Sequence, residues 1–320
     1  MYQNIYRVFP AQMETQSTGR LQVNVVTETG LHPIENATIR ISDANQPEVT
    51  IEELTTDESG LSPEIDLPTP PLEYSLEPLA ERPYSEYTIR ISAPGFETVE
   101  IDGSQLLPAV TALQNVEMLP APEEPATAEL FVIPPHTLYY NYPPKIAEPE
   151  IKPTAESGEI VLREVVIPEF VVVHDGPPTD TTARNYYVRY RDYIKNVASS
   201  EIYATWPEAT ILANVLAIMS FTLNRVFTEW YRNQGYNFTI TSSTAFDHKW
   251  MSGRNIYDNI GTAVDSIFNN YLSRPNVRQP ILTQYCDGVN VTCPNWMTVM
   301  QEGKNRYPHD LKRYQNQSSG

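Results

Sequence analysis

The stretch Thr205-Trp206-Pro207-Glu208-Ala209-Thr210-Ile211-Leu212, residues 205–212, marks where the longest predicted helix begins. Thr205 and Glu208 have the spacing of a capping box, and Pro207 suits a first helical turn because an N–H there has no helical partner. Apolar residues then recur every three or four positions as far as Trp230, and Gly235 follows. We therefore expect a helix over 206–233, and its wide apolar arc predicts that it is central and mostly buried.

Two shorter helices are expected on either side of the long one, over 192–199 and 255–272. The second has one apolar face with helical spacing. Upstream, the apolar runs 160–166 and 170–173 predict strands that enter a core. The back of the chain, 159–300, is therefore expected to be an α+β domain with a long central helix.

The front of the chain shows the alternation of half-buried strands instead. Apolar residues alternate with polar ones over 21–25, 37–41, 65–67, 87–91, 99–101 and 116–118. Residues 55–60, Thr-Thr-Asp-Glu-Ser-Gly, have the composition of a turn. Six or seven short strands separated by turns predict a β-sandwich over 18–120.

A proline-rich segment separates these two parts. Nine of the 34 residues from Pro120 to Pro153 are proline, so residues 121–158 are expected to form an extended, semi-rigid linker. Its tyrosines, at 139, 140 and 142, are expected to pack along a neighbouring domain or to contact a sugar or a partner. With a polar tail over 301–320, the predicted fold class is multidomain α+β.

The acidity of the chain is confined to its front. The sequence holds 40 acidic and 22 basic residues, and 25 of the acids but only 7 of the bases lie in residues 1–158. A strongly negative front half repels nucleic acids and anionic membrane surfaces, so we expect no nucleic-acid partner. No stretch approaches the roughly 18 uninterrupted apolar residues of a membrane span, and residues 1–20 lack the basic-then-apolar order of a signal peptide. Any chemistry is therefore expected in the back half.

Glu201 is the candidate catalytic residue. It ends the predicted helix before the turn that leads to Trp206, where two helices meet. A carboxylate at a helix C-terminus opposes the helix dipole, and partial burial there would raise its pKa and suit it to general acid catalysis. The plain alternative is an ordinary solvated or capping glutamate.

The front residues Pro33 to Ile39, Thr56-Asp57 with Gly60, and Tyr87 to Phe96 resemble the carboxypeptidase regulatory-like, or transthyretin-like, sandwich family. That resemblance implies a stalk or adhesion module without catalysis. In the back half, residues 193–201, Tyr-Ile-Lys-Asn-Val-Ala-Ser-Ser-Glu, followed by Trp206-Pro207-Glu208, resemble the stage II sporulation protein D and LytB amidase-enhancer family over 185–298.

This second resemblance implies a lytic transglycosylase that cuts peptidoglycan glycan strands with a single Glu at position 201. The candidate substrate-binding residues are Lys195, Ser200, Thr244 and Tyr285. Thr244 lies in a polar stretch, 241–247, that is expected to line a sugar groove or to be a plain loop. The implied setting is the bacterial cell envelope, spore surface or exterior, or the mother-cell cytoplasm.

Several positions depart from that family and favour an alternative. Met219 stands where the family has an Arg that could hold an anionic group, Asn196 stands for its Gly, and Ile202-Tyr203 for its Met-Pro. The end of the domain also lacks the family's Gln-Trp-Gly segment. The alternative function is a non-catalytic peptidoglycan-binding or spore- or cell-surface structural protein of the same fold.

The only two cysteines, Cys286 and Cys293, are seven residues apart around Asp287-Gly288. They suit a small disulfide-closed hairpin or two free thiols. Some relatives bind zinc in this region, and His248 is the third ligand that the sequence offers. The expectation is no cofactor, with zinc as the lesser alternative.

Overall fold

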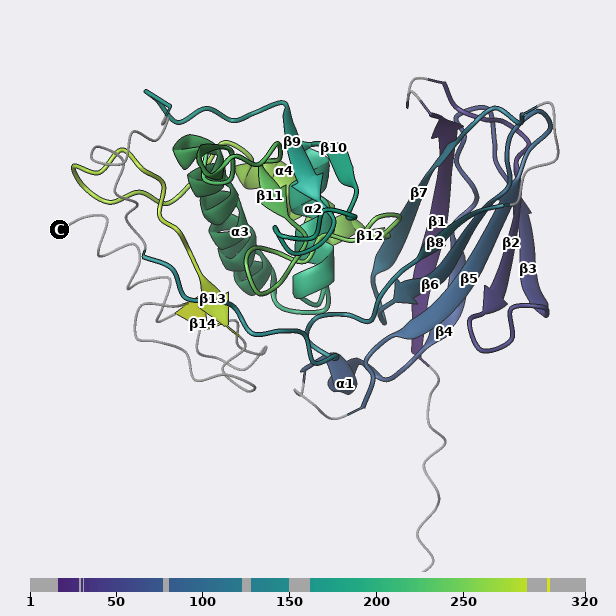
Figure 1. Cartoon of the computed structure of the whole chain (residues 1–320). Coiled ribbons are helices and arrows are strands. Elements are labelled where there is room, and N and C mark those ends of the chain that lie inside the picture. Colours follow the sequence, from purple (N-terminus) through teal and green to yellow (C-terminus); the bar gives the residue numbers. More distant parts are fainter. Residues whose placement is uncertain are drawn as a thin grey trace, which may run out of the picture.

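The structure, a computed structural model, describes residues 17–28, 30, 32–76, 81–122, 128–149, 162–286 and 298–299. These residues form a mixed α+β protein with several sheets and a few helices (Figure 1). The sheets of the front half lie to one side, and the long helix α3 lies on the other.

The front half forms two sheets. One has the order β12-β7-β1-β4 and contains β1 (Ser17–Thr27), β4 (Ile65–Thr69), β7 (Thr111–Met118) and β12 (Ile256–Tyr257). The other has the order β3-β2-β5-β6-β8 and contains β2 (Thr38–Asp43), β3 (Thr50–Thr55), β5 (Ser85–Ser92), β6 (Val99–Leu106) and β8 (Glu129–Val132). The β1–β7 and β6–β8 pairs are parallel, and the other pairs of these two sheets are antiparallel.

Alternation explains these strands. Leu21, Val23 and Val25 of β1 are fully buried, while their neighbours are partly exposed. The same period buries Ile39 and Ile41 in β2, so each of the six stretches of alternating residues is confirmed as a strand. β3 was not predicted because its sequence is mostly polar and its residues are largely exposed at a sheet edge.

The back half has three main helices, α2 (Tyr190–Glu201), α3 (Glu208–Thr228) and α4 (Asp258–Ile267). A small sheet of order β10-β9-β11 accompanies them, with β9 (Phe170–His174), β10 (Asn185–Arg189) and β11 (Ile240–Thr241). The remaining elements are the short helix α1 (Leu72–Leu76), the 3-10 turn η1 (Arg232–Gln234), and the two-residue strands β13 (Tyr285–Cys286) and β14 (Thr298–Val299).

The helix α3 is the central, mostly buried helix that its apolar arc predicts. By length and composition it could cross a membrane, but 83% of its most apolar 18-residue window is buried inside the protein. That burial is typical of a core helix. The helix ends at Thr228 because Glu229 adopts a left-handed conformation (φ 47°), earlier than the predicted 233.

The predicted capping box at the start of α3 is wrong. The N-cap residue is Pro207, whose carbonyl accepts the N–H groups of Thr210 and Ile211, and no side chain caps the helix. The Thr205 hydroxyl instead donates to the hydroxyl of Ser75 in α1 (2.7 Å). The Thr205 side chain, which the capping-box motif predicts to cap the helix, therefore bonds Ser75 of the front half instead.

Two other expectations for the back half are corrected. Residues 162–168 form no strand. The N–H of Leu162 donates instead to the carbonyl of Phe227 at the end of α3 (3.0 Å). The third helix covers only 258–267, because Ile256 and Tyr257 pair with β7 as β12. The back half thus lends a strand to a front-half sheet.

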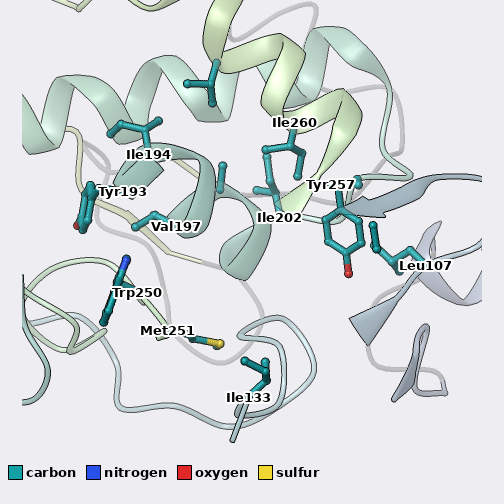
Figure 2. Packing of buried hydrophobic residues seen from close by; sticks show 14 of the residues in the cluster. Leu107, Ile133, Tyr193, Ile194, Val197, Ile202, Trp250, Met251, Tyr257 and Ile260 are labelled. Atoms are coloured by element: carbon teal, nitrogen blue, oxygen red, sulfur yellow. The ribbon is translucent and has the colours of Figure 1, made fainter. Parts of the chain in front are cut away.

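The segment expected to be a linker, 121–158, is built into the fold over its described part. Residues 129–132 form β8 beside β6, and residues 133–149 then follow the back half. Figure 2 shows Ile133 close to Met251, and Leu107 of the front half close to Tyr257 of the back half, and all four belong to one buried apolar cluster. Its prolines have no backbone N–H to donate, but the carbonyls and side chains of the segment can still bond residues of both halves.

Candidate functional site

Glu201 is the last residue of α2, and its side chain is buried. Its exposed fraction is 5%, and Oε1 accepts a hydrogen bond from the backbone N–H of Lys249 (2.6 Å). Position 196 of α2 is also close to this segment, because the side-chain amide of Asn196 accepts the N–H of Met251 (3.0 Å) and donates to its carbonyl (2.8 Å). Asn196 thereby fixes the segment after Lys249 against α2.

Burial dominates the electrostatics of Glu201. It raises the pKa of the carboxyl from the ordinary 4.5 to about 7, although the Lys145 ammonium, the Lys249 N–H and the Lys249 charge act in the opposite direction. Burial likewise lowers the pKa of Lys145 to about 8, against the pull of Glu201 and Asp247. A carboxyl with a pKa near neutrality can give and take a proton, as the sequence-based hypothesis for Glu201 requires.

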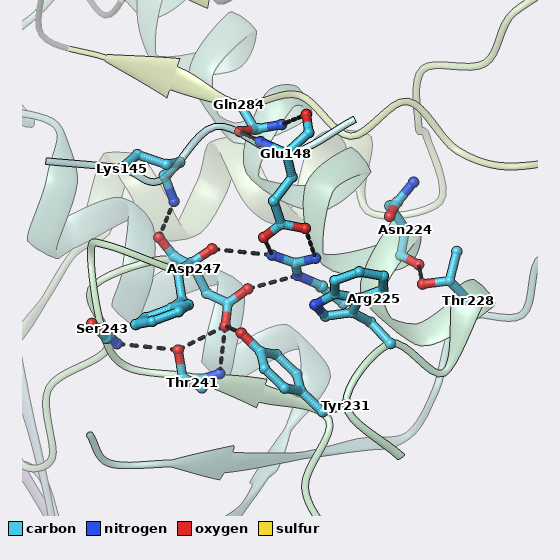
Figure 3. Close-up of polar contacts among 12 residues, drawn as sticks. Lys145, Glu148, Asn224, Arg225, Thr228, Tyr231, Thr241, Ser243, Asp247 and Gln284 are labelled. Carbon is cyan, nitrogen blue, oxygen red and sulfur yellow. Dashed lines mark hydrogen bonds and ion pairs between the residues drawn. The ribbon is translucent and has the colours of Figure 1, made fainter. Parts of the chain in front are cut away.

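A second group of charges, around Arg225 of α3, is linked to Glu201 through Lys145, which is affected by the charges of Glu201, Asp247, Arg225 and Glu148. Figure 3 shows the guanidinium bound by both oxygens of Glu148 (2.9 and 2.6 Å) and by Asp247 Oδ1 (2.7 Å). Asp247 Oδ2 also accepts bonds from the Tyr231 hydroxyl (2.6 Å) and from Thr241. Each charge of this group is therefore paired and hydrogen-bonded, which is the condition under which buried charges persist.

Met219 is fully buried and contributes only to the apolar core. The guanidinium that α3 does bring to this region is Arg225, six residues further on, and it is held by Glu148 and Asp247. Sequence reasoning missed Arg225, Asp247, Glu148 and Lys145. A signal was present, since an Arg within the apolar arc of a buried helix requires an acidic partner.

The candidate substrate-binding residues lie in different places. Lys195 of α2 forms an ion pair with Asp265 of α4 (2.9 Å), and the Ser200 hydroxyl donates to the carbonyl of Asn196 (2.8 Å). Thr244 lies three residues before Asp247, and its hydroxyl donates to the carbonyl of Pro143 (2.9 Å). Only Thr244 is therefore linked to the segment that carries Lys145, and the side chain of Tyr285 lies outside the described residues.

The zinc alternative stays a prediction. Among the residues that the structure describes, no three His, Cys, Asp or Glu side chains are grouped so that they could hold a metal ion. His248 is buried against the ring of Phe221 (4.4 Å between centroids), and burial lowers its pKa. The side chains of Cys286 and Cys293 lie outside the described residues.

Comparisons with known proteins add little to this picture. No family model matches the chain, and no curated protein matches it. Among solved structures, the minor pilin GBS52 of Streptococcus agalactiae is 15% identical, with a TM-score of 0.24, and the match covers 36% of this chain and 49% of the pilin.

The Bacillus anthracis TIE protein is 16% identical with a TM-score of 0.23, and the match covers 33% of this chain and 17% of that one. A catechol 1,2-dioxygenase from an Acinetobacter species is 13% identical with a TM-score of 0.24, with 38% and 60% covered. The chain spans less than two thirds of each of these three proteins. Likenesses this weak support no inference about function.

Proposed function

We propose that this protein acts on peptidoglycan as a lytic transglycosylase of the sporulation protein D type, with Glu201 as its single acid and base. In this proposal residues 18–120 are a β-sandwich that positions the enzyme, and residues 159–300 are the catalytic domain, at the cell envelope or spore surface. The observation that carries the proposal is the buried Glu201 carboxyl, whose pKa lies at about 7.

One carboxyl suffices for this reaction because the sugar supplies its own nucleophile. Protonated Glu201 gives its proton to the glycosidic oxygen as the bond from that oxygen to C1 breaks. The 6-hydroxyl oxygen of the same sugar then bonds to C1 and gives its proton to the Glu201 carboxylate. The products are a free sugar hydroxyl and a 1,6-anhydro end, and the enzyme returns to its starting state.

A pKa near 7 suits Glu201 both to donate a proton in the first step of the reaction and to accept one in the second. At neutral pH a carboxyl with the ordinary pKa of 4.5 would be almost entirely ionised and could not act as the acid. Burial at the end of α2 keeps a substantial fraction of Glu201 protonated, and the Lys249 N–H stabilises the carboxylate that proton donation leaves.

A second candidate function, non-catalytic binding of peptidoglycan, is favoured by two observations. Glu201 is only 5% exposed, and the position of the family's Arg is taken by the buried Met219. Methionine cannot replace a guanidinium in binding an anionic group. In this alternative the charges around Glu201 serve to fix the fold, and the glycan is bound without turnover.

The deciding experiment is incubation of the purified chain with peptidoglycan glycan strands, with mass spectrometry of the soluble products. We expect 1,6-anhydro ends from the wild type, none from Glu201→Gln, and unchanged release from Glu208→Gln, a matched control on the exposed first turn of α3. If the wild type releases no anhydro products but sediments with the cell wall, the binding function replaces the enzymatic one.

A further inference from the structure

We propose that Lys145 is a positioning residue for Glu201, and that residues 143–148, which precede the sporulation protein D-like domain, therefore complete its site. The part that Lys145 plays in the reaction rests on the proposed function. The electrostatic pairing of the two side chains does not, and it can be measured in a protein that cuts nothing.

Residues 143–148 are held against the back half along their length. The carbonyl of Pro143 accepts the Thr244 hydroxyl (2.9 Å), and the N–H of Ile146 donates to the carbonyl of Ala245 (2.7 Å). Glu148 binds Arg225 with both carboxylate oxygens, and its backbone exchanges two hydrogen bonds with the amide of Gln284 (3.0 and 2.8 Å). Lys145 therefore reaches the site from a segment that is fixed on both sides of it.

The Lys145 ammonium and the Glu201 carboxylate both form hydrogen bonds to the backbone of the same short stretch, residues 247–249. Lys145 donates to the carbonyl of Asp247, as Figure 3 shows, while Glu201 accepts the N–H of Lys249. The ammonium also lies 4.9 Å from the centre of the Phe221 ring, which favours a cation at this place. This placement explains why Glu201 is the charged neighbour with the largest effect on the pKa of Lys145, and Lys145 the one with the largest effect on the pKa of Glu201.

The other titratable groups of this region are bound elsewhere or carry no charge. Asp247 and Glu148 are paired with Arg225, and the Lys249 ammonium is drawn to Asp175 as well as to Glu201. Burial favours the neutral forms of His248 and Tyr193, and Tyr193 lies close enough to Asp247 and Glu201 to be affected by their charges. Lys145 is thus the side-chain cation with the largest effect on Glu201.

This arrangement has a direct consequence for the proposed reaction. When Glu201 gives up its proton, a negative charge forms in a buried place, and the Lys145 ammonium stabilises that charge where water cannot. Without the ammonium, Glu201 would hold its proton more tightly. It would then be a weaker acid in the first half of the reaction, and its activity would move to higher pH.

The test is the titration of the Glu201 carboxyl, followed by NMR of protein labelled with 13C in the glutamate side chains. The Glu201 signal is assigned by its loss in Glu201→Gln. In Lys145→Met, a neutral side chain of similar length, we expect the titration midpoint to rise by about one pH unit or more, since an opposite charge at close range lowers a carboxyl pKa by roughly 1–3 units. Lys145→Gln gives a second neutral variant should one of them fold poorly.

Arg191→Met serves as the matched control, because it removes a cation from α2 whose partner is Asp265. It should leave the Glu201 midpoint where it is, and Lys145→Arg should largely preserve it. An unchanged midpoint in a folded Lys145→Met protein would overturn the proposal. Absence of anhydro products from the wild type would overturn the proposed enzyme but leave this pairing standing, so the two failures can be told apart.

Discussion

The two halves of the molecule use charge in opposite ways. The front half carries the whole net negative charge of the chain, and a pair on its sheets such as Arg40–Glu53 lies on the surface, with side chains 56% and 55% exposed. The back half has no net charge, yet it buries Arg225 and Asp247 completely. Net charge is therefore a poor guide to where charges affect stability and chemistry in this protein.

Burial accounts for the difference. In water, the attraction of an exposed pair is weakened by solvent and by salt, and such a pair contributes little to stability. Where residues 143–148 of the front half lie against the back half, desolvation raises the pKa of Glu201 to about 7 and lowers that of Lys145 to about 8. A residue whose pKa is shifted in this way is a candidate for function.

The largest expected effect comes from removing Arg225. Arg225→Met leaves the buried Asp247 and the partly buried Glu148 without their cation, so we expect a loss of about 3–5 kcal/mol in the free energy of unfolding. Arg40→Met, its counterpart on a front sheet, should cost less than about 1 kcal/mol. Urea unfolding followed by far-UV circular dichroism, which reports on the secondary structure of both halves, measures both, and similar costs for the two variants would contradict the contrast between the halves.

Glu201 should make the stability of the folded protein depend on pH, because burial shifts its pKa. Its pKa is raised on folding, so the folded protein binds the proton more tightly than the unfolded chain. The stability that this provides is present below pH 4.5 and is lost as the pH rises through about 7, a change of roughly 2–3 kcal/mol.

Glu201→Gln should remove that slope, since glutamine does not titrate. Glu53→Gln, at an exposed site on β3, should leave it unchanged. The measurement is the free energy of unfolding at several pH values between 4.5 and 7.5. An equal slope in the wild type and in Glu201→Gln would show that another group is responsible.

A smaller effect is expected where the two halves meet. The amide of Asn255 bonds the N–H and the carbonyl of Gln105 in β6 (3.1 and 2.9 Å), and both residues are fully buried. Asn255→Ala leaves that N–H without its partner, while the carbonyl keeps the Tyr257 hydroxyl, so we expect a cost of about 1–3 kcal/mol.

The matched change within the front half is Asn24→Ala, which breaks an exposed bond to Asn115 and should cost under about 0.5 kcal/mol. Circular dichroism reports on the secondary structure of both halves, and fluorescence reports on the back half, which holds all four tryptophans. If Asn255→Ala moves only the fluorescence transition, the halves unfold separately and their contact is weaker than the buried bonds imply.

The features of the fold and site that could be predicted from the sequence are those set by residues close together in the chain. The alternation that buries Leu21, Val23 and Val25 is contained in five residues, so the strand was predictable, and so was the apolar arc of α3. Glu201 was also within reach, because its place at the end of α2 follows from the residues around it.

Contacts between distant segments were not predictable in this way. Glu148 and Arg225 are 77 residues apart, and nothing near Glu148 indicates that its partner lies on a buried helix. The proline-rich composition of 121–158 suggested a spacer, since prolines favour extended chain, but composition does not say what that chain lies against. Residues 143–148 meet the segment 244–249 through tertiary packing alone.

The smallest predicted effect concerns Thr205, where a local signal and a tertiary contact compete. If Thr205 donates to Ser75 as in the structure, Thr205→Ala and Ser75→Ala should each cost about 0.5–1.5 kcal/mol, and the double variant should cost clearly less than their sum. If Thr205 instead capped α3, its loss would cost about 1 kcal/mol whether or not Ser75 is present, and the two costs would add. A double-mutant cycle on urea midpoints therefore separates a helix cap from a bond that joins the two halves, and additivity would restore the capping box that the sequence indicated.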